Sequence, residues 1–224
     1  MNKKIFIVVP VYNEGAVLRD VVRGIKNAGF ENIIIIDDGS DDKTPEIQKE
    51  NVFYIRHVLN RGKGAATKTG FEAAKILGAD VVVTIDGDGQ HYVEDIPKLT
   101  KPILEDKFDV VLGMRDFRSK EVPLLKKAYN FVGNFFTWLF YGLWVSDSQS
   151  GFRAYSRRAL GVIDTKTDRY EYDSEVIREI KKHGLKFKEV PIKVRYTAYS
   201  KSKKSKQGFL NGIKTLIKMI ISSQ

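Results

Sequence analysis

The 224-residue chain contains no cysteine, which excludes a disulfide framework and a zinc site built from thiolates. It also lacks any uninterrupted apolar run of about 18 residues, so the sequence predicts no membrane-spanning helix. A signal peptide is not expected either, because Pro10, Asn13 and Glu14 end the first apolar stretch too early. These absences indicate a cytoplasmic protein in a reducing compartment.

Two glycine-rich phosphate-binding signatures are missing as well. No Gly-x-Gly-x-x-Gly follows the first predicted strand, and no Walker lysine loop is present. Gly62-Lys63-Gly64 is only a fragment of such a loop. The sequence therefore disfavours dinucleotide-dependent oxidoreductases and P-loop enzymes.

The composition, with 42% hydrophobic and 29% charged residues, is typical of a globular protein. The net charge of +10 is concentrated in Lys181–Lys218, which carries twelve Lys or Arg and one acid, Glu189. Such a block can be a solvated face, a nucleic-acid patch, or a seat for phosphates and anionic lipid. A non-enzymatic nucleic-acid-binding module is the remote alternative, because the Ser/Lys loop 200–206 has no interleaved aromatic residues.

Strands and helices alternate four times in the first half of the chain. Aliphatic runs predict strands at Ile5–Val9, Ile33–Ile36, Val52–Val58 and Val81–Ile85, each followed by a segment with helical features. This pattern predicts an α/β fold with an open, doubly wound, mostly parallel sheet flanked by helices in a single domain, residues 1–207. Further on, we expect helices at Pro97–Leu104 and Tyr172–Lys182, strands at Asp109–Gly113 and Val190–Val194, and a terminal basic amphipathic helix within 208–224.

Polar and acidic clusters follow three of the predicted strands, where ligands of such sheets bind. They are Tyr12-Asn13-Glu14, Asp37-Asp38-Gly39-Ser40 and Asp86-Gly87-Asp88. An extended backbone would place the carboxylates of Asp86 and Asp88 on one side, where such hard oxygen ligands suit magnesium or manganese. Gly87 would let the chain bend around a ligand. The alternatives are an acidic turn here and simple turn capping by Asp37 or Ser40.

The most aromatic segment is Tyr129–Val145, YNFVGNFFTWLFYGLWV. Its asparagines and glycines make it a poor spanning helix. The sequence leaves two alternatives open: a buried core helix, or an interfacial helix that faces lipid.

Five motifs together resemble family 2 glycosyltransferases, most closely those that act on dolichyl or polyprenyl phosphate. They are VVPVYNE at 8–14, DDGS at 37–40, GKG at 62–64, DGDGQH at 86–91 and DSQSGFRAYS at 147–156. The resemblance implies a Rossmann-like GT-A fold and an inverting, metal-dependent transfer from a nucleotide sugar, either GDP-mannose or a UDP-sugar.

The resemblance also implies roles for individual residues. The metal, magnesium or manganese, would be held by Asp86, Asp88 and Gln90, with His91 as a neighbour only. The acceptor phosphate would meet Arg115 and Arg153. The nucleotide sugar would contact a longer set: Pro10, Tyr12, Glu14, Asp37, Asp38, Lys63, Asp86, Gly87, Asp88, Arg195 and Lys201.

Two acceptors remain open. A lipid phosphate is already largely ionised at neutral pH, since its second pKa is about 6, and needs no strong base. A saccharide hydroxyl would need a carboxylate to take its proton, and Asp147 is the candidate. The first alternative implies peripheral binding to the anionic cytoplasmic face of a membrane, and leaves room for a separate membrane-anchor protein as a partner.

Overall fold

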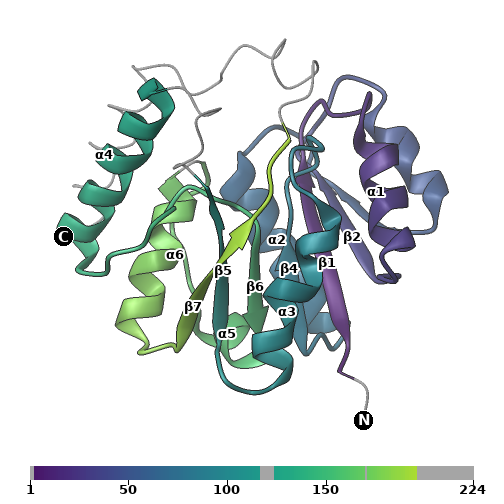
Figure 1. The fold of residues 1–224 in the computed structure, drawn as a ribbon. Helices are drawn as coiled ribbons and strands as arrows, with labels where there is room; N and C mark the ends of the chain where they lie inside the picture. Colours follow the sequence, from purple (N-terminus) through teal and green to yellow (C-terminus); the bar gives the residue numbers. More distant parts are fainter. Residues whose placement is uncertain (1–2, 117–123, 170, 196–224) are drawn as a thin grey trace.

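The computed structural model describes residues 3–116, 124–169 and 171–195. Its centre is one seven-stranded sheet in the order β3-β2-β1-β4-β6-β5-β7 (Figure 1). The strands are β1 Ile5–Val11, β2 Ile33–Asp37, β3 Phe53–Arg56, β4 Val81–Thr84, β5 Val110–Arg115, β6 Arg153–Ser156 and β7 Phe187–Ile192. All neighbouring pairs are parallel except β4–β6 and β5–β6. The predicted mostly parallel, single-domain α/β fold is confirmed.

Helices cover both faces of the sheet. The α-helices are α1 Leu18–Asn27, α2 Lys63–Ile76, α3 Ile96–Leu104, α4 Leu124–Tyr141, α5 Arg157–Val162 and α6 Glu171–Lys182, with short 3-10 helices at Thr44–Glu50 and Val93–Asp95. Side chains of α1 and α3 pack with Ile7 and Val9 of β1 on one face. Side chains of α2, α5 and α6 pack with Phe6 and Val8 on the other. The central strands are therefore buried on both sides, which explains their unbroken aliphatic runs.

Two elements were not predicted, and two predicted strands have other bounds. The sequence did not predict β6 or α5, because Arg153-Ala-Tyr-Ser is short and carries a charged residue that strands rarely bury. The last strand begins at Phe187, not at Val190. The third strand is limited to Phe53–Arg56, at the sheet edge.

Proline in β1 fits the topology. Pro10 pairs with Ile36 of β2, but the pairing of β1 with β4 already ends at Val8 opposite Thr84. The missing N–H of Pro10 therefore costs no ladder bond at the end of the strand. This is where the chain leaves the sheet toward the first polar cluster.

Candidate functional site

The first two polar clusters form one connected rim at the carboxyl ends of β1 and β2. The backbone N–H of Asn13 donates to Ser40 Oγ at 2.9 Å, and that of Glu14 donates to Thr44 Oγ1 at 3.0 Å. Asn13 has a φ of 57°, a left-handed conformation that asparagine tolerates better than most residues. Tyr12 and Glu14 are half-buried on this rim, and Pro10 is buried behind it. The predicted nucleotide-binding residues of this motif thus lie together.

Asp37 and Asp38 are buried and hold the surrounding backbone. Asp37 accepts hydrogen bonds from Ser40 N at 2.8 Å and from the Tyr54 hydroxyl. Burial, followed by the hydrogen bond to Asp37, raises the pKa of Tyr54. Asp37 therefore caps the turn that follows β2, which is the alternative role considered for it.

Asp38 organises the next loop. Its two carboxylate oxygens accept from the backbone N–H of Arg61 at 3.0 Å and of Gly62 at 2.6 Å. Its Oδ1 also lies 2.7 Å from His57 Nδ1. This acid therefore fixes the loop that opens α2 and delivers Lys63.

Lys63 lies between two acids. Its Nζ is 2.9 Å from Asp86 Oδ1 and 3.4 Å from Asp173 Oδ2, while His91 Nε2 is 3.6 Å from the other oxygen of Asp86. Burial opposes the charged forms, but the opposite charges prevail: they hold the pKa of Asp86 well below its usual range and raise the pKa of Lys63. Both groups are therefore charged at neutral pH.

Asp173 is a site residue that the sequence reading missed. It lies at the start of α6 and is 5% exposed. The sequence did indicate that this acid is buried, because Asp173 precedes Val176 and Ile177 by one helical turn and so lies on their inward face. A buried acid on that face requires a cation, which Lys63 supplies.

Glycines allow these parts to approach closely. A Cβ on Gly151 would collide with the Lys63 ammonium and lie 3.1 Å from Asp86 Oδ1. A Cβ on Gly87 would collide with Val11 of β1. Gly87 thus serves close packing of the acidic loop against β1.

Asp88 and Gln90 lie in direct contact. Asp88 Oδ1 accepts from the Gln90 backbone N–H at 3.0 Å, and Asp88 Oδ2 contacts the Gln90 side-chain amide. With Asp86, they provide hard oxygen donors of the kind that magnesium and manganese prefer. Within residues 3–116, 124–169 and 171–195, no three His, Cys, Asp or Glu side chains gather as a ready metal site. The donor set fits a metal held by one or two carboxylates and completed by substrate phosphates.

The segment after β7 runs alongside this acidic loop. Val194 forms an antiparallel bridge with His91, and Arg195 N donates to Gln90 O at 2.8 Å. The Arg195 guanidinium lies over the Tyr92 ring, 4.2 Å from its centroid. Arg195 is therefore next to the predicted metal residues, and its role toward a diphosphate stays a prediction. Lys201 and the predicted helix 208–224 lie outside the described residues.

Arg115 and Asp147 form one unit. Asp147 Oδ2 accepts from Arg115 Nε at 2.7 Å and from its backbone N–H at 3.1 Å, while Oδ1 accepts from Nη2 at 2.8 Å. The Asp147 side chain is fully buried, whereas that of Arg115 is 31% exposed. The pair holds one edge of the planar guanidinium in a fixed orientation. Asp147 is thus placed to orient Arg115, and the structure does not support its predicted role as a base for a substrate hydroxyl.

The predicted contact of Arg153 with an acceptor phosphate is wrong. Arg153 lies in β6 with 1% exposure, and it donates to Ser150 O at 2.7 Å and Ser148 O at 2.6 Å. Its head group is 4.0 Å from Asp173. A guanidinium buried with these partners holds the 147–151 loop by hydrogen bonds and is not accessible to a phosphate.

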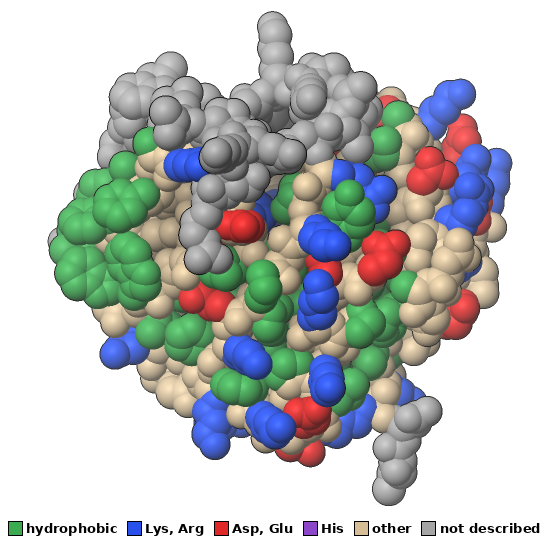
Figure 2. All heavy atoms as spheres, in the orientation of Figure 1, with side chains coloured by type: hydrophobic (Ala, Val, Ile, Leu, Met, Phe, Trp, Pro, Cys, Tyr) green, Lys and Arg blue, Asp and Glu red, His purple; other side chains and the backbone are tan. Residues whose placement is uncertain are grey.

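Helix α4 exposes much of the aromatic segment. Phe131, Val132, Phe135, Trp138 and Leu139 are 39–60% exposed, and Trp144 just after the helix is 48% exposed. Figure 2 shows hydrophobic side chains gathered over α4 at the left of the molecule. Of the two alternatives, the buried core helix is wrong, and contact with lipid stays a prediction. The helices of the described residues include none that is long and apolar enough to span a bilayer.

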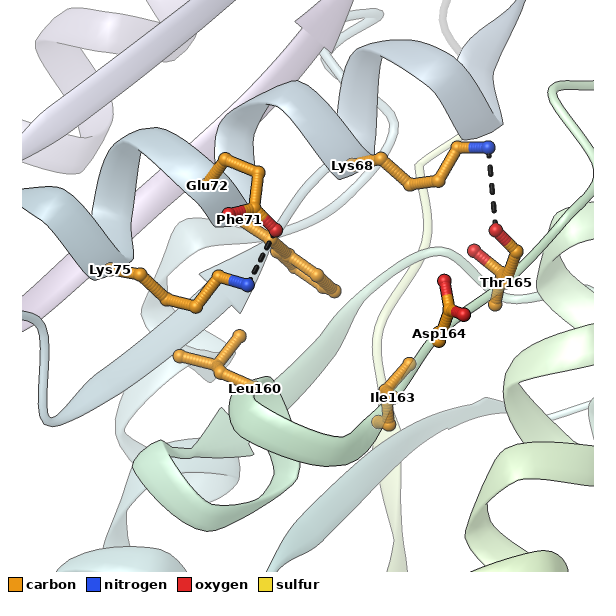
Figure 3. A pocket seen from close by; sticks show the side chains of 8 residues that line it. All are labelled: Lys68, Phe71, Glu72, Lys75, Leu160, Ile163, Asp164 and Thr165. Carbon is orange, nitrogen blue, oxygen red and sulfur yellow. Dashed lines mark hydrogen bonds and ion pairs between the residues drawn. The ribbon is translucent and has the colours of Figure 1, made fainter.

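A hollow lined by residues of α2, α5 and the following loop lies apart from these motifs (Figure 3). Its volume is about 70 Å³, well below the roughly 300 Å³ or more of pockets that bind small molecules. Its lining includes Lys68, Phe71 and Leu160, and none of the predicted site residues. It is too small for a nucleotide.

Comparison with known proteins identifies the family of the chain. The model of the family described as glycosyl transferase family 2 matches residues 6–163. The chain is 42% identical over 222 residues to the UDP-N-acetylglucosamine–dolichyl-phosphate N-acetylglucosaminyltransferase of Methanococcus voltae, covering 89% of this chain and 88% of that protein. It is 33% identical over 199 residues to a dolichyl-phosphate hexose transferase of Haloferax volcanii, covering 86% and 83%.

A solved structure supports the fold. Glucosyl-3-phosphoglycerate synthase from Mycobacterium tuberculosis, in complex with Mn²⁺, uridine diphosphate and phosphoglyceric acid, matches with a TM-score of 0.73 and 18% identity, over 99% of this chain and 78% of that one. At that identity, the likeness establishes the fold alone. With the family model spanning most of the sheet and its motifs, the chain belongs to glycosyl transferase family 2.

Proposed function

We propose that this glycosyltransferase moves N-acetylglucosamine from its UDP-activated form to a polyprenyl phosphate such as dolichyl phosphate. The observation that carries the proposal is the 42% identity to the M. voltae enzyme, which extends over nearly the whole of both chains. The sequence motifs alone left the base, the sugar and the acceptor open. The name of that relative favours uridine, N-acetylglucosamine and a lipid phosphate.

The donor would lie at the carboxyl ends of β1, β2 and β4. Asp88 and Gln90, with Asp86, would hold a divalent metal that stabilises the charge developing on the departing diphosphate. Arg195, stacked on Tyr92, would contribute a cation at the same side. Lys63 keeps Asp86 charged and in place.

The reaction then needs little proton chemistry. A lipid phosphate oxygen attacks the anomeric carbon, and the bond from that carbon to the diphosphate oxygen breaks, with the electron pair leaving on UDP. Attack from the opposite side inverts the anomeric configuration. Because the phosphate is already an anion, no protein base has to accept a proton.

The Arg115–Asp147 pair favours a phosphate acceptor over a sugar hydroxyl. A hydroxyl acceptor needs a base within hydrogen-bond reach, but both oxygens of Asp147 are engaged by Arg115. A fixed, partly exposed guanidinium is instead suited to bind a phosphate.

The exposed aromatic face of α4 supports work at a membrane surface. Aromatic side chains favour the interface between lipid and water, where the phosphate of a polyprenyl lipid lies. The basic excess in Lys181–Lys218 adds attraction to anionic lipid. We therefore place the enzyme peripherally on the cytoplasmic face of its membrane.

The test is a matrix of donors and acceptors with purified full-length protein. UDP-N-acetylglucosamine, UDP-glucose and GDP-mannose are each paired with dolichyl phosphate or a free saccharide, with Mg²⁺ or Mn²⁺. We expect a glycolipid product, seen by mass spectrometry, with UDP-N-acetylglucosamine and dolichyl phosphate. Transfer to the saccharide but not to the lipid would overturn the proposal, and a preference for another donor would correct its sugar.

A further inference from the structure

Helix α4 holds the loop around Asp147 through the buried side chain of Asn134. Asn134 Nδ2 donates to Ser146 O at 2.7 Å. Its Oδ1 accepts from Ser148 N at 2.9 Å and from Ser148 Oγ at 2.8 Å. Asn134 is only 4% exposed, so these three hydrogen bonds form away from water. They bracket Asp147 on both sides in the sequence.

The Ser146 end of the same loop is also held by β7 and by a second buried asparagine of α4. Glu189 accepts from Ser146 N at 2.7 Å and from Ser146 Oγ at 3.1 Å. Asn130, one turn before Asn134 on α4, donates to Ser146 O at 3.0 Å. The backbone next to Asp147 is thus anchored to a helix and to a strand that lie far apart in the chain.

We propose that Asn134 is a positioning residue for the acceptor phosphate, an inference that rests on the proposed function. Through Ser146 and Ser148, Asn134 sets the position of Asp147. Asp147 in turn fixes the plane of the Arg115 guanidinium by two side-chain hydrogen bonds. Because a planar fork recognises phosphate by geometry, a small rotation of that plane weakens binding without any loss of charge.

The two faces of α4 differ in polarity and in exposure. Asn130, Asn134 and Thr137 lie on the buried face, at helical spacing, whereas Phe131 and Trp138 are exposed. The Thr137 hydroxyl donates within α4 to Gly133 O at 2.9 Å and lies 3.3 Å from Ser174 Oγ of α6. The helix would therefore contact the lipid side of the acceptor and also fix the group that binds its phosphate.

The test uses Asn134→Leu, which keeps the side-chain size but removes all three hydrogen bonds. We expect the KM for the lipid phosphate to rise about tenfold, with the KM for UDP-N-acetylglucosamine changed less than about twofold. Thr137→Val is the matched control, because it removes a buried hydroxyl on the same face of α4. It should leave the ratio of the two KM values unchanged.

A double variant tests whether Asn134 acts on acceptor binding through Asp147 or only through the stability of the fold. Asp147→Asn should shift acceptor KM in the same direction, and adding Asn134→Leu to it should give less than the product of the two effects. If Asn134→Leu fails to fold by circular dichroism, Ser148→Ala removes only one of the three bonds and should give a smaller shift of the same kind.

Equal changes in both KM values, multiplicative effects in the double variant, or the same shift in Thr137→Val would each overturn the inference. These outcomes require wild-type protein that is active on the lipid phosphate. Wild-type protein that is inactive on every lipid phosphate would overturn the proposed function together with the inference.

Discussion

At the scale of single residues, the site is a series of paired charges. The charges alternate in sign from Asp86 after β4, through Lys63 at the start of α2, to Asp173 at the start of α6. Arg115 at the end of β5 and Asp147 in the loop before β6 form a second pair. Removing one partner of a partly buried pair leaves an uncompensated charge, so these residues position one another as well as any substrate.

Asp88→Ala should reduce transfer by at least about a hundredfold, because it removes an oxygen ligand of the proposed metal. The thermal midpoint should change little, since Asp88 is half-buried in a loop and contributes little to the core. The measurement is product formation at saturating substrate, with and without chelator. Asp20→Ala is the control, because that carboxylate is 79% exposed on α1. Full activity of Asp88→Ala, or activity that excess chelator leaves unchanged, contradicts the metal site.

Arg115→Lys keeps the positive charge but loses the planar fork. We expect the KM for the acceptor to rise about 10- to 100-fold, the equivalent of one charge-assisted hydrogen bond, with a much smaller change for the donor. Initial rates with each substrate varied in turn provide the measurement. Arg158→Lys serves as the control, since that side chain is 60% exposed and pairs with Asp109. An equal effect on both substrates would assign Arg115 to the diphosphate or to the fold.

At the scale of elements, α4 is the exception to the packing of the other helices. It lies beside α6 at one end of the sheet (Figure 1) and leaves a row of aromatic side chains in water. Exposed apolar patches of this kind mark interaction surfaces in soluble proteins. The asparagines on its buried face bind Ser146, so α4 also supports the loop that carries Asp147.

Replacing Phe135 and Trp138 by serine should weaken binding to vesicles several-fold, because each ring adds buried apolar area at the lipid interface. Co-sedimentation with vesicles that contain anionic lipid gives the bound fraction. Ile76→Ser is the matched control, since Ile76 is 85% exposed on α2, away from α4. Undiminished binding of the double variant would show that α4 does not face the membrane.

At the scale of the whole molecule, charge is divided unevenly along the chain. The basic block begins at the end of α6, continues through β7 and runs on in sequence beyond the described residues. Each basic residue near an anionic leaflet contributes about 1 kcal/mol, within a Debye length of about 8 Å at physiological salt. Several acting together would give reversible, salt-sensitive attachment.

Truncation after Tyr199 should therefore reduce binding to anionic vesicles, and the binding that remains should depend less on salt. The comparison is full-length against truncated protein, from low salt to about 0.5 M, where screening is strong. Neutral vesicles provide the control for the apolar contribution. Full-length protein that stays in the supernatant with anionic vesicles at low salt would contradict the membrane assignment and favour a soluble acceptor.

The sequence by itself determined the fold class, the first four strands along the chain and the place of the acidic clusters after them. Strands such as Ile33–Asp37 are buried on both faces, so their aliphatic runs identify them without knowledge of their neighbours. The polar loops follow those strands directly, so the acidic loop at Asp86 was expected near the rim at Tyr12. The motifs also indicated the family.

Only the tertiary structure decided which charges meet. Asp173 and Lys63 are 110 positions apart, and Asp147 reaches Arg115 across 32 positions. A motif states which residue types are present, but the direction of a buried side chain depends on packing and on its nearest opposite charge. For that reason Arg153 was predicted to bind the acceptor phosphate, although it is buried in the sheet. Asp147 was predicted to accept a proton as a base, although it binds the Arg115 guanidinium.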